Sequence, residues 1–235
     1  MNKLYTFGCS YTEGFSEFFK SPMYLKYKEF NGGVFPKSWP DILAEKLKFD
    51  LVNYGEGAAG NQQIFNIFSK KCRELQKGDI VIIEWSFIER YRLALDNENW
   101  IKLGPGKSAD APISEKTHEE ILLNRTLKPY VDEIYDYENI IDFLCESIGV
   151  KVYYWTIISD LLYNQPKELL LQEKYLLCDK ILDRHYNTFR VIEDFGGKKI
   201  KDETLGLIND NHMSKSGHLV QAELFYEHIM NYKQK

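Results

Sequence analysis

The chain opens with KLYTFGCSYTEG, residues 3–14, and this stretch decides how the fold begins. Residues 3–7 are rich in β-forming side chains and too few to make a helix before Gly8, so they predict a short buried strand. A glycine lets the backbone turn sharply, and Ser10 follows directly after Gly8 and Cys9. We therefore expect Ser10 on the turn at the carboxyl end of a strand, which is where ligands bind in open α/β sheets.

Strand and helix patterns alternate along the rest of the chain. The nearly unbroken apolar run from Ile80 to Ile83 is typical of a central parallel strand that is covered on both faces. This run belongs to a strand predicted at 79–85, and further strands are predicted at 49–54, 150–156 and 189–192. Helices are predicted at 38–47, 61–75, 116–147, 166–186 and 214–232. This alternation predicts a three-layer α/β/α sandwich with a mainly parallel central sheet, in one domain that spans residues 1–235.

Two stretches interrupt the alternation. Pro129 falls inside the long helical pattern at 116–147, so we expect it to kink that helix or to divide it in two. Between Ser86 and about Ser114 the pattern gives way to polar and turn residues, including Gly104, Pro105 and Gly106. We expect a loop insertion or lid over residues 86–115.

Composition limits the classes of function. With 235 residues, of which 44% are hydrophobic, the chain can bury a substantial core. A net charge of -5 and the lack of a basic stripe argue against nucleic-acid binding. No apolar stretch approaches the ~18 residues of a membrane-spanning helix, and the first strand begins too early for a signal peptide. A cytoplasmic location without membrane contact is expected, while nothing in the sequence sets the oligomeric state.

Neither a metal nor an organic cofactor is expected. The four cysteines do not show the spacing of metal ligands. Three of them fall in helical patterns, where a thiol behaves as a small apolar residue: Cys72, Cys145 and Cys178. The histidines on helical stretches lack matching ligands: His118, His185 and His228. Cys9 is next to Ser10, but alternation along the strand turns its side chain away from the side that Ser10 faces.

The other end of the chain carries the partners that a serine nucleophile needs. A serine hydroxyl becomes reactive when an imidazole lies within hydrogen-bond reach, usually with a carboxylate that orients the imidazole. Ser10, His212 and Asp210 supply one group of each kind. The sequence therefore suggests a serine hydrolase whose site joins the two ends of the chain.

Four sequence blocks stand in a defined order. They are FGCS at 7–10, VNYGEGAAGN at 52–61, IIEWS at 82–86 and DNHMSKSGH at 210–218. With these blocks the chain resembles the SGNH hydrolase superfamily, also called GDSL-type esterases and lipases, over nearly its whole length. The resemblance implies an SGNH-hydrolase-like, flavodoxin-like α/β/α fold. It also implies that esters are hydrolysed through an acyl-enzyme on Ser10, with His212 as the base.

The resemblance implies backbone donors for the oxyanion as well. One is the N–H of Ser10, and the second is an amide of the second block. The match to Gly60 followed by Asn61 favours Gly60, whereas counting from Asn53 favours Ala58. Both positions stay open.

The third block departs from the family, which has an Asn in a Gly-x-Asn-Asp stretch where this chain has Glu84 to Phe87. Ser86 can donate through its hydroxyl, and Asn61 can take over the missing amide role, although either could also cap a turn. Arg90 and Arg92 follow on the same loop. Either arginine is a candidate to receive an anionic or sugar substrate, or is a solvated loop residue.

The last block departs in its spacing. The family commonly has an Asp three residues before the His, but Asn209 fills that place and Asp210 stands two residues before His212. Side chains two residues apart on an extended segment project to the same side, so Asp210 can still orient the ring. The alternative is a Ser–His dyad in which Asn209 holds the ring. His218, the competing base, is expected to be a packing residue inside the terminal helix.

Three functions fit these observations. The leading hypothesis is an esterase for small acyl groups, with O-acetyl carbohydrate as the substrate, because the chain lacks the long apolar entrance segment expected for lipids. An O-acyltransferase, in which a sugar hydroxyl replaces water, is the second. A non-catalytic carbohydrate-binding or assembly protein is the third, prompted by the missing Asn and by abundant aromatic residues that can stack on sugars.

Overall fold

The computed structural model describes most of the chain. The described residues are 1–14, 22–87, 90–94, 100–103, 114, 116–117, 127–156, 201–202, 206–207 and 212–232. The helix expected at 166–186 and the strand expected at 189–192 lie outside the described residues.

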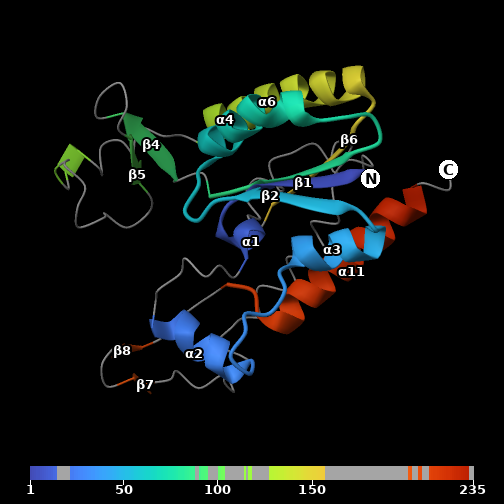
Figure 1. The fold of residues 1–235 in the computed structure, drawn as a ribbon. Helices are drawn as coiled ribbons and strands as arrows, with labels where there is room; N and C mark the ends of the chain where they lie inside the picture. The colour runs from blue at the N-terminus through green and yellow to red at the C-terminus, as the bar shows by residue number, and fades with distance from the viewer. Residues whose placement is uncertain are drawn as a thin grey trace.

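A parallel sheet lies at the centre of the molecule (Figure 1). Its strand order is β2 (Asp50–Gly55), β1 (Lys3–Gly8), β3 (Ile80–Trp85) and β6 (Lys151–Thr156). β1 is paired on both sides, with Gly8 opposite Gly55 on β2 and Phe7 opposite Ile83 on β3. Every side chain of β3 is buried, as its apolar run predicts for a central strand.

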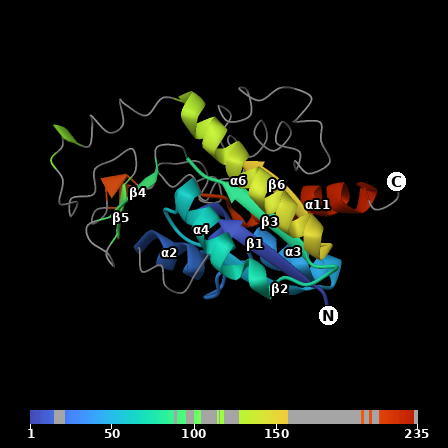
Figure 2. The ribbon, with the colours of Figure 1, turned by 90° about the horizontal axis from the view of Figure 1, so that it is seen from above.

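Helices cover both faces of this sheet, as Figures 1 and 2 show. α4 (Asn61–Lys71) and α6 (Leu127–Ile148) lie on one face, and α3 (Trp39–Leu47) and α11 (Lys215–Tyr232) on the other. The chain moves outward from β1 to β2 through α3 and then back across β1 to β3 through α4. Right-handed crossovers in opposite directions place these helices on opposite faces. The expected three-layer α/β/α architecture is confirmed.

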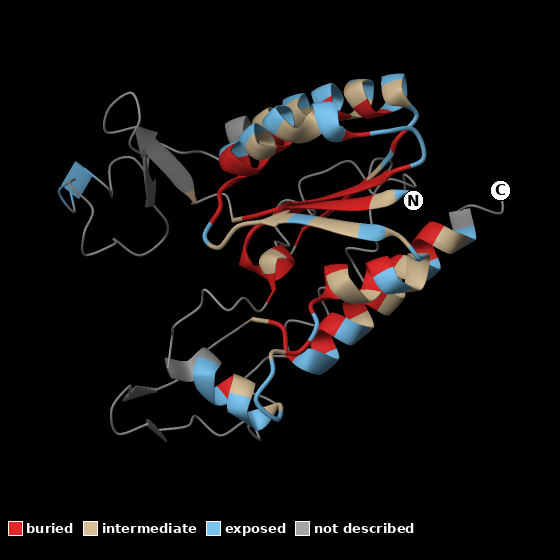
Figure 3. Ribbon diagram, in the orientation of Figure 1, coloured by how far each residue is buried: buried red, intermediate tan, exposed pale blue. Residues whose placement is uncertain are grey.

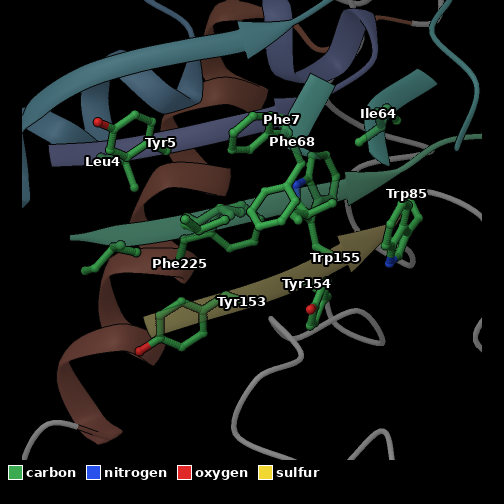
Figure 4. Close-up of a cluster of buried hydrophobic side chains, with 14 of the residues drawn as sticks. Leu4, Tyr5, Phe7, Ile64, Phe68, Trp85, Tyr153, Tyr154, Trp155 and Phe225 are labelled. Atoms are coloured by element: carbon green, nitrogen blue, oxygen red, sulfur yellow. The ribbon is translucent and has the colours of Figure 1, made fainter. Parts of the chain in front are cut away.

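The core fills the two spaces between the sheet and its helices. Figure 3 shows burial along β1 and β3 and on the inward sides of the helices. On the α3 side, Trp39, Trp155 and Phe225 meet edge to face, with ring centroids 5.0 to 5.8 Å apart. On the α4 side, Phe7 packs edge to face on Phe68, with centroids 5.5 Å apart (Figure 4).

Local sequence signals explain how two of the helices begin. The Asp41 carboxylate accepts a hydrogen bond from the N–H of Ser38 at 3.0 Å, which is half of a capping box. Pro40 lies in the first turn of α3, where its missing N–H costs nothing. Pro129 is likewise the third residue of α6, which runs from Leu127 to Ile148. Residues 116–117 are also helical and residues 118–126 lie outside the described residues, so the expected kink or division of this helical stretch stays a prediction.

Shorter elements lie at the edges of the sandwich. The segment predicted as a loop insertion contains an antiparallel pair, β4 (Tyr91–Ala94) and β5 (Trp100–Leu103), beyond the carboxyl ends of the sheet strands in Figure 1. The remaining elements are α1 (Ser10–Glu13), α2 (Pro22–Phe30), η1 (Cys72–Glu74), β7 (Lys201–Asp202) and β8 (Gly206–Leu207). In the described part of the chain, no helix combines the length and the apolar character needed to cross a membrane.

The aromatic cluster on the α3 side leads to a stability prediction. Phe225→Ala removes a fully buried ring that packs on Trp39 and Trp155, so we expect the free energy of unfolding to fall by about 3–5 kcal/mol. The matched control is Phe143→Ala on α6, where the side chain is 73% exposed and the expected change is within about 0.5 kcal/mol. Urea denaturation followed by circular dichroism measures both. Equal losses in the two variants would contradict this placement of the core.

Candidate active site

Ser10 lies where β1 passes directly into α1. The carbonyl oxygen of Cys9 accepts hydrogen bonds from the N–H groups of Thr12 (3.0 Å) and Glu13 (2.9 Å), which closes a tight turn around Ser10. The turn stands at the carboxyl edge of the sheet, and Ser10 is 8% exposed. The expected position of Ser10, at the carboxyl end of a buried strand, is what the structure shows.

His212 meets Ser10 across the whole length of the chain. Its Nε2 atom lies 2.8 Å from the Oγ atom of Ser10, a hydrogen-bond distance between residues 202 positions apart. The ring of Tyr11 stacks on the His212 ring, with centroids 5.0 Å apart and planes inclined by 29°. A neutral imidazole in this position can take the serine proton as the hydroxyl attacks a carbonyl carbon.

Hydrogen bonds through Trp39 hold the two halves of the site together. The indole Nε1–H of Trp39 donates to the carbonyl oxygen of Tyr11 at 3.0 Å, and its backbone N–H donates to Nδ1 of His218 at 3.2 Å. The Lys215 N–H at the start of α11 donates to the Tyr27 hydroxyl at 2.8 Å. His218 is thus a buried acceptor inside α11, in the packing position expected for it, and these bonds anchor the chain just after His212.

The turn after β2 crosses the end of β1 beside Ser10. At its start the Glu56 N–H donates to the carbonyl oxygen of Gly8 at 3.0 Å. At its end Asn61 begins α4 and contacts Ser86, which directly follows β3. A Cβ atom on Gly60 would lie 2.4 Å from the carbonyl oxygen of Arg90, so this close approach requires glycine.

Two candidates for the missing Asn of the third block are in contact with each other. Asn61 Nδ2 donates to the carbonyl oxygen of Ser86 at 3.1 Å, and the Ser86 N–H donates to Asn61 Oδ1 at 2.6 Å. The Asn61 side chain thereby pairs with the end of β3 as a neighbouring strand would. The Ser86 hydroxyl, fully buried, accepts a hydrogen bond from Nη1 of Arg90 at 3.0 Å.

The remaining candidates are placed only in part. The guanidinium of Arg90 lies over the ring of Phe87, 4.7 Å from its centroid, and Arg92 belongs to β4. Ala58 has a left-handed backbone with φ of 59° in the turn before Gly60. Asn209 and Asp210 lie outside the described residues, so the identity of the residue that orients His212 stays a prediction. Among the described residues, no group of His, Cys, Asp and Glu could hold a metal ion.

A buried carboxylate that the motifs did not single out lies beneath Ser10. Glu84, at 0% exposure, accepts hydrogen bonds from the N–H of Cys9 (3.1 Å), the Sγ of Cys9 (2.9 Å) and the Oγ1 of Thr12 (2.5 Å). Burial raises the pKa of the Glu84 carboxyl above its usual range, while these donors act in the opposite direction. The sequence feature that could have pointed to Glu84 is its charge, because it stands inside the otherwise apolar run of β3.

The Cys9 thiol is a partner of this carboxyl and is fully buried. Burial, with the Glu84 carboxyl as the second cause, raises the pKa of the Cys9 thiol to about 12. A thiol that stays protonated at neutral pH is a poor nucleophile. The burial and the raised pKa of the thiol therefore argue against Cys9 as a nucleophile.

Comparisons with known proteins place the fold. Searches of protein-family models and of curated proteins found no match. Among solved structures, protein YXIM of Bacillus subtilis superposes with a TM-score of 0.50 at 11% identity, covering 99% of this chain and 57% of that one. At this identity the likeness shows a shared fold.

Two further solved structures align with nearly the whole chain at lower TM-scores. A member of the lipolytic protein G-D-S-L family from Veillonella parvula has a TM-score of 0.46 at 15% identity, covering 97% of both chains. A lipase/acylhydrolase from Enterococcus faecalis has a TM-score of 0.40 at 14% identity, covering 99% of this chain and 97% of that chain.

The burial of Cys9 generates a labelling prediction. With a pKa of about 12, roughly one Cys9 thiol in ten thousand is ionised at pH 8, so iodoacetamide should leave Cys9 unmodified in the native protein while it alkylates the half-buried Cys72. Peptide mapping by mass spectrometry measures each site. Denatured protein, in which both residues react, is the control. Modification of native Cys9 as fast as Cys72 would show that the thiol is accessible and ionised.

Proposed function

We propose that this protein is a serine esterase with Ser10 as nucleophile and His212 as general base. The observation that carries the proposal is the 2.8 Å contact between Ser10 Oγ and His212 Nε2 at the carboxyl edge of a parallel sheet. Edges of this kind hold the ligand sites of open α/β sheets, above all where the strand order reverses, as it does between β1 and β3. The order of the four sequence blocks supports the same reaction class.

The proposed reaction has two steps. His212 takes the hydroxyl proton as Ser10 Oγ attacks the ester carbonyl carbon, and the tetrahedral intermediate collapses when His212 returns that proton to the departing alcohol. Water then attacks the acyl group, giving its proton to His212. The proton passes to Ser10 as the carboxylic acid leaves, so the enzyme is restored.

Two backbone amides are proposed as oxyanion donors. In the described part of the chain, neither the N–H of Ser10 nor that of Gly60 has an acceptor, so both are available to a developing negative charge. One such donor typically contributes ~3 kcal/mol to lowering the barrier. The Ser86 hydroxyl hydrogen and the second Nδ2 hydrogen of Asn61 are side-chain candidates for a third donor, and Ala58 remains the alternative to Gly60.

The proposed substrate is a small acyl ester, an acetyl group on a carbohydrate. Aromatic and polar side chains lie in the described part of this edge: Tyr11, Asn61, Ser86, Phe87 and Arg90. Aromatic rings and polar donors suit a sugar better than a long acyl chain. Arg90 donates one guanidinium hydrogen bond to Ser86, and its other N–H groups can donate to an oxygen-rich substrate.

The proposal predicts the loss of activity on changing either reacting residue. In Ser10→Ala and His212→Ala, hydrolysis of p-nitrophenyl acetate should fall by about 10³-fold or more, because nucleophile and base act as a unit. Ser69→Ala, which alters an exposed hydroxyl on α4, is the matched control and should keep full activity. A p-nitrophenyl series from acetate to octanoate tests the acyl group, with acetate expected to be the best substrate.

Other outcomes of this series point to other functions. Wild-type hydrolysis that survives Ser10→Ala would refute the nucleophile. Acetyl transfer to an added sugar in preference to water would indicate the acyltransferase. Absence of both hydrolysis and fluorophosphonate labelling of Ser10, together with carbohydrate binding, would indicate a binding protein.

The spacing in the last block predicts a second pair of variants. If Asp210 orients the ring, Asp210→Ala should lower kcat by about 10²-fold or more, whereas Asn209→Ala should stay within about threefold of wild type. The reverse ranking would establish the dyad held by Asn209. Steady-state kinetics with p-nitrophenyl acetate, beside thermal melts that check folding, decide between them.

A further inference from the structure

We infer that Glu84 is a positioning residue, which holds the turn around Ser10 in the shape that catalysis needs. This inference rests on the proposed function, because it takes Ser10 as the nucleophile. It adds a residue for which the family resemblance supplies no role.

The hydrogen bonds of Glu84 are directed at the two sides of Ser10. Oε2 accepts from the N–H of Cys9 at 3.1 Å and from the hydroxyl of Thr12 at 2.5 Å, while Oε1 accepts from the thiol of Cys9 at 2.9 Å. Cys9 precedes Ser10 and Thr12 follows it within the same helical turn. One carboxyl group thus joins both ends of the turn to the central strand β3.

The fit between this carboxyl group and β1 is close. A Cβ atom on Gly8 would lie 2.4 Å from Glu84 Oε2, so the absence of a side chain at Gly8 makes room for Glu84. The position of the Glu84 carboxyl group therefore requires glycine at position 8.

The cost of burying Glu84 argues for a specific role. A fully buried carboxyl group is unfavourable unless hydrogen bonds or opposite charges compensate it. Among the described residues, the hydrogen bonds from Cys9 and Thr12 compensate Glu84 directly, and the positive charge of Arg90 also favours its carboxylate without a salt bridge. Every position of β3 is buried, so an aliphatic residue at position 84 would match the other buried positions of the strand better.

Positioning should show in kcat rather than in KM. Glu84 lies beneath the turn and is fully buried, so its replacement leaves the substrate contacts in place while it loosens Ser10. A displacement of a reacting group by about 1 Å can lower the reaction rate by up to ~10²-fold. The N–H of Cys9 is held by Glu84, so the direction of the adjacent Ser10 N–H depends on the same contact.

The test compares variants of Glu84 that fill a similar volume. Glu84→Leu removes both oxygen atoms and should lower kcat about tenfold or more, with KM within about twofold of wild type. Glu84→Gln can keep an oxygen in the place of Oε2, which accepts from both the Cys9 N–H and the Thr12 hydroxyl, and its amide nitrogen then faces the Cys9 sulfur, a weak acceptor; it should stay within about threefold of wild type. The rate of fluorophosphonate labelling of Ser10 should follow kcat.

The matched control is a buried carboxyl group at the opposite end of the same strand. Asp79, which is 3% exposed, accepts hydrogen bonds from the N–H groups of Lys3 (2.8 Å) and Gln76 (2.9 Å), far along the strands from Ser10. Asp79→Asn should lower the melting temperature without changing kcat. If it lowers kcat as much as Glu84→Leu does, the effect of Glu84 is one of stability and the inference is overturned.

Thr12 provides the same test without disturbing β3. Thr12→Val removes the hydroxyl at constant shape and should lower kcat, while Thr12→Ser should restore it. In a Glu84→Leu background Thr12→Val should have little further effect, because the contact is already lost. Wild-type kcat in both Glu84→Leu and Thr12→Val would refute the inference, whereas wild-type protein that neither hydrolyses esters nor labels at Ser10 would refute the proposed function instead.

Discussion

The parallel pairing of β1 with β2 on one side and β3 on the other is the constraint on which the rest of the structure depends. Because the three strands run in the same direction, their carboxyl ends meet at one edge of the sheet. Ser10 follows β1, the turn at 56–61 follows β2, and Ser86 follows β3. The pairing of the strands thereby brings groups that are dozens of residues apart in the chain to the same edge of the sheet.

Pairing alone does not bring His212 to that edge. α11 lies against α3 on one face of the sheet, and Trp39 at the start of α3 donates to both Tyr11 and His218. The packing of these two helices therefore also sets the distance between the first and last segments of the chain. The contact between Ser10 and His212 therefore depends on the core, because Trp39 belongs both to the aromatic cluster and to the hydrogen bonds that join the two segments.

Most of the fold could be predicted because its signals are local. The apolar run of β3 and the caps of α3 report burial and helix starts within a few residues. Pro129 lies in the first turn of α6, where a proline is tolerated, and the helical pattern alone did not locate this start near Leu127. The β4–β5 pair was not foreseen, since this short hairpin outside the main sheet need not show a clear apolar alternation.

The sequence by itself determined the alternating α/β architecture, the placement of Ser10 at the end of a strand and the choice of His212 as its partner. Only the tertiary structure decided what the neighbouring side chains do. Asn61 is turned toward the backbone of Ser86, and Glu84 is turned toward the turn around Ser10. The physical reason is that secondary structure follows from residues close together in the chain. The direction of a buried polar side chain follows from the hydrogen-bond partners that distant segments bring within reach.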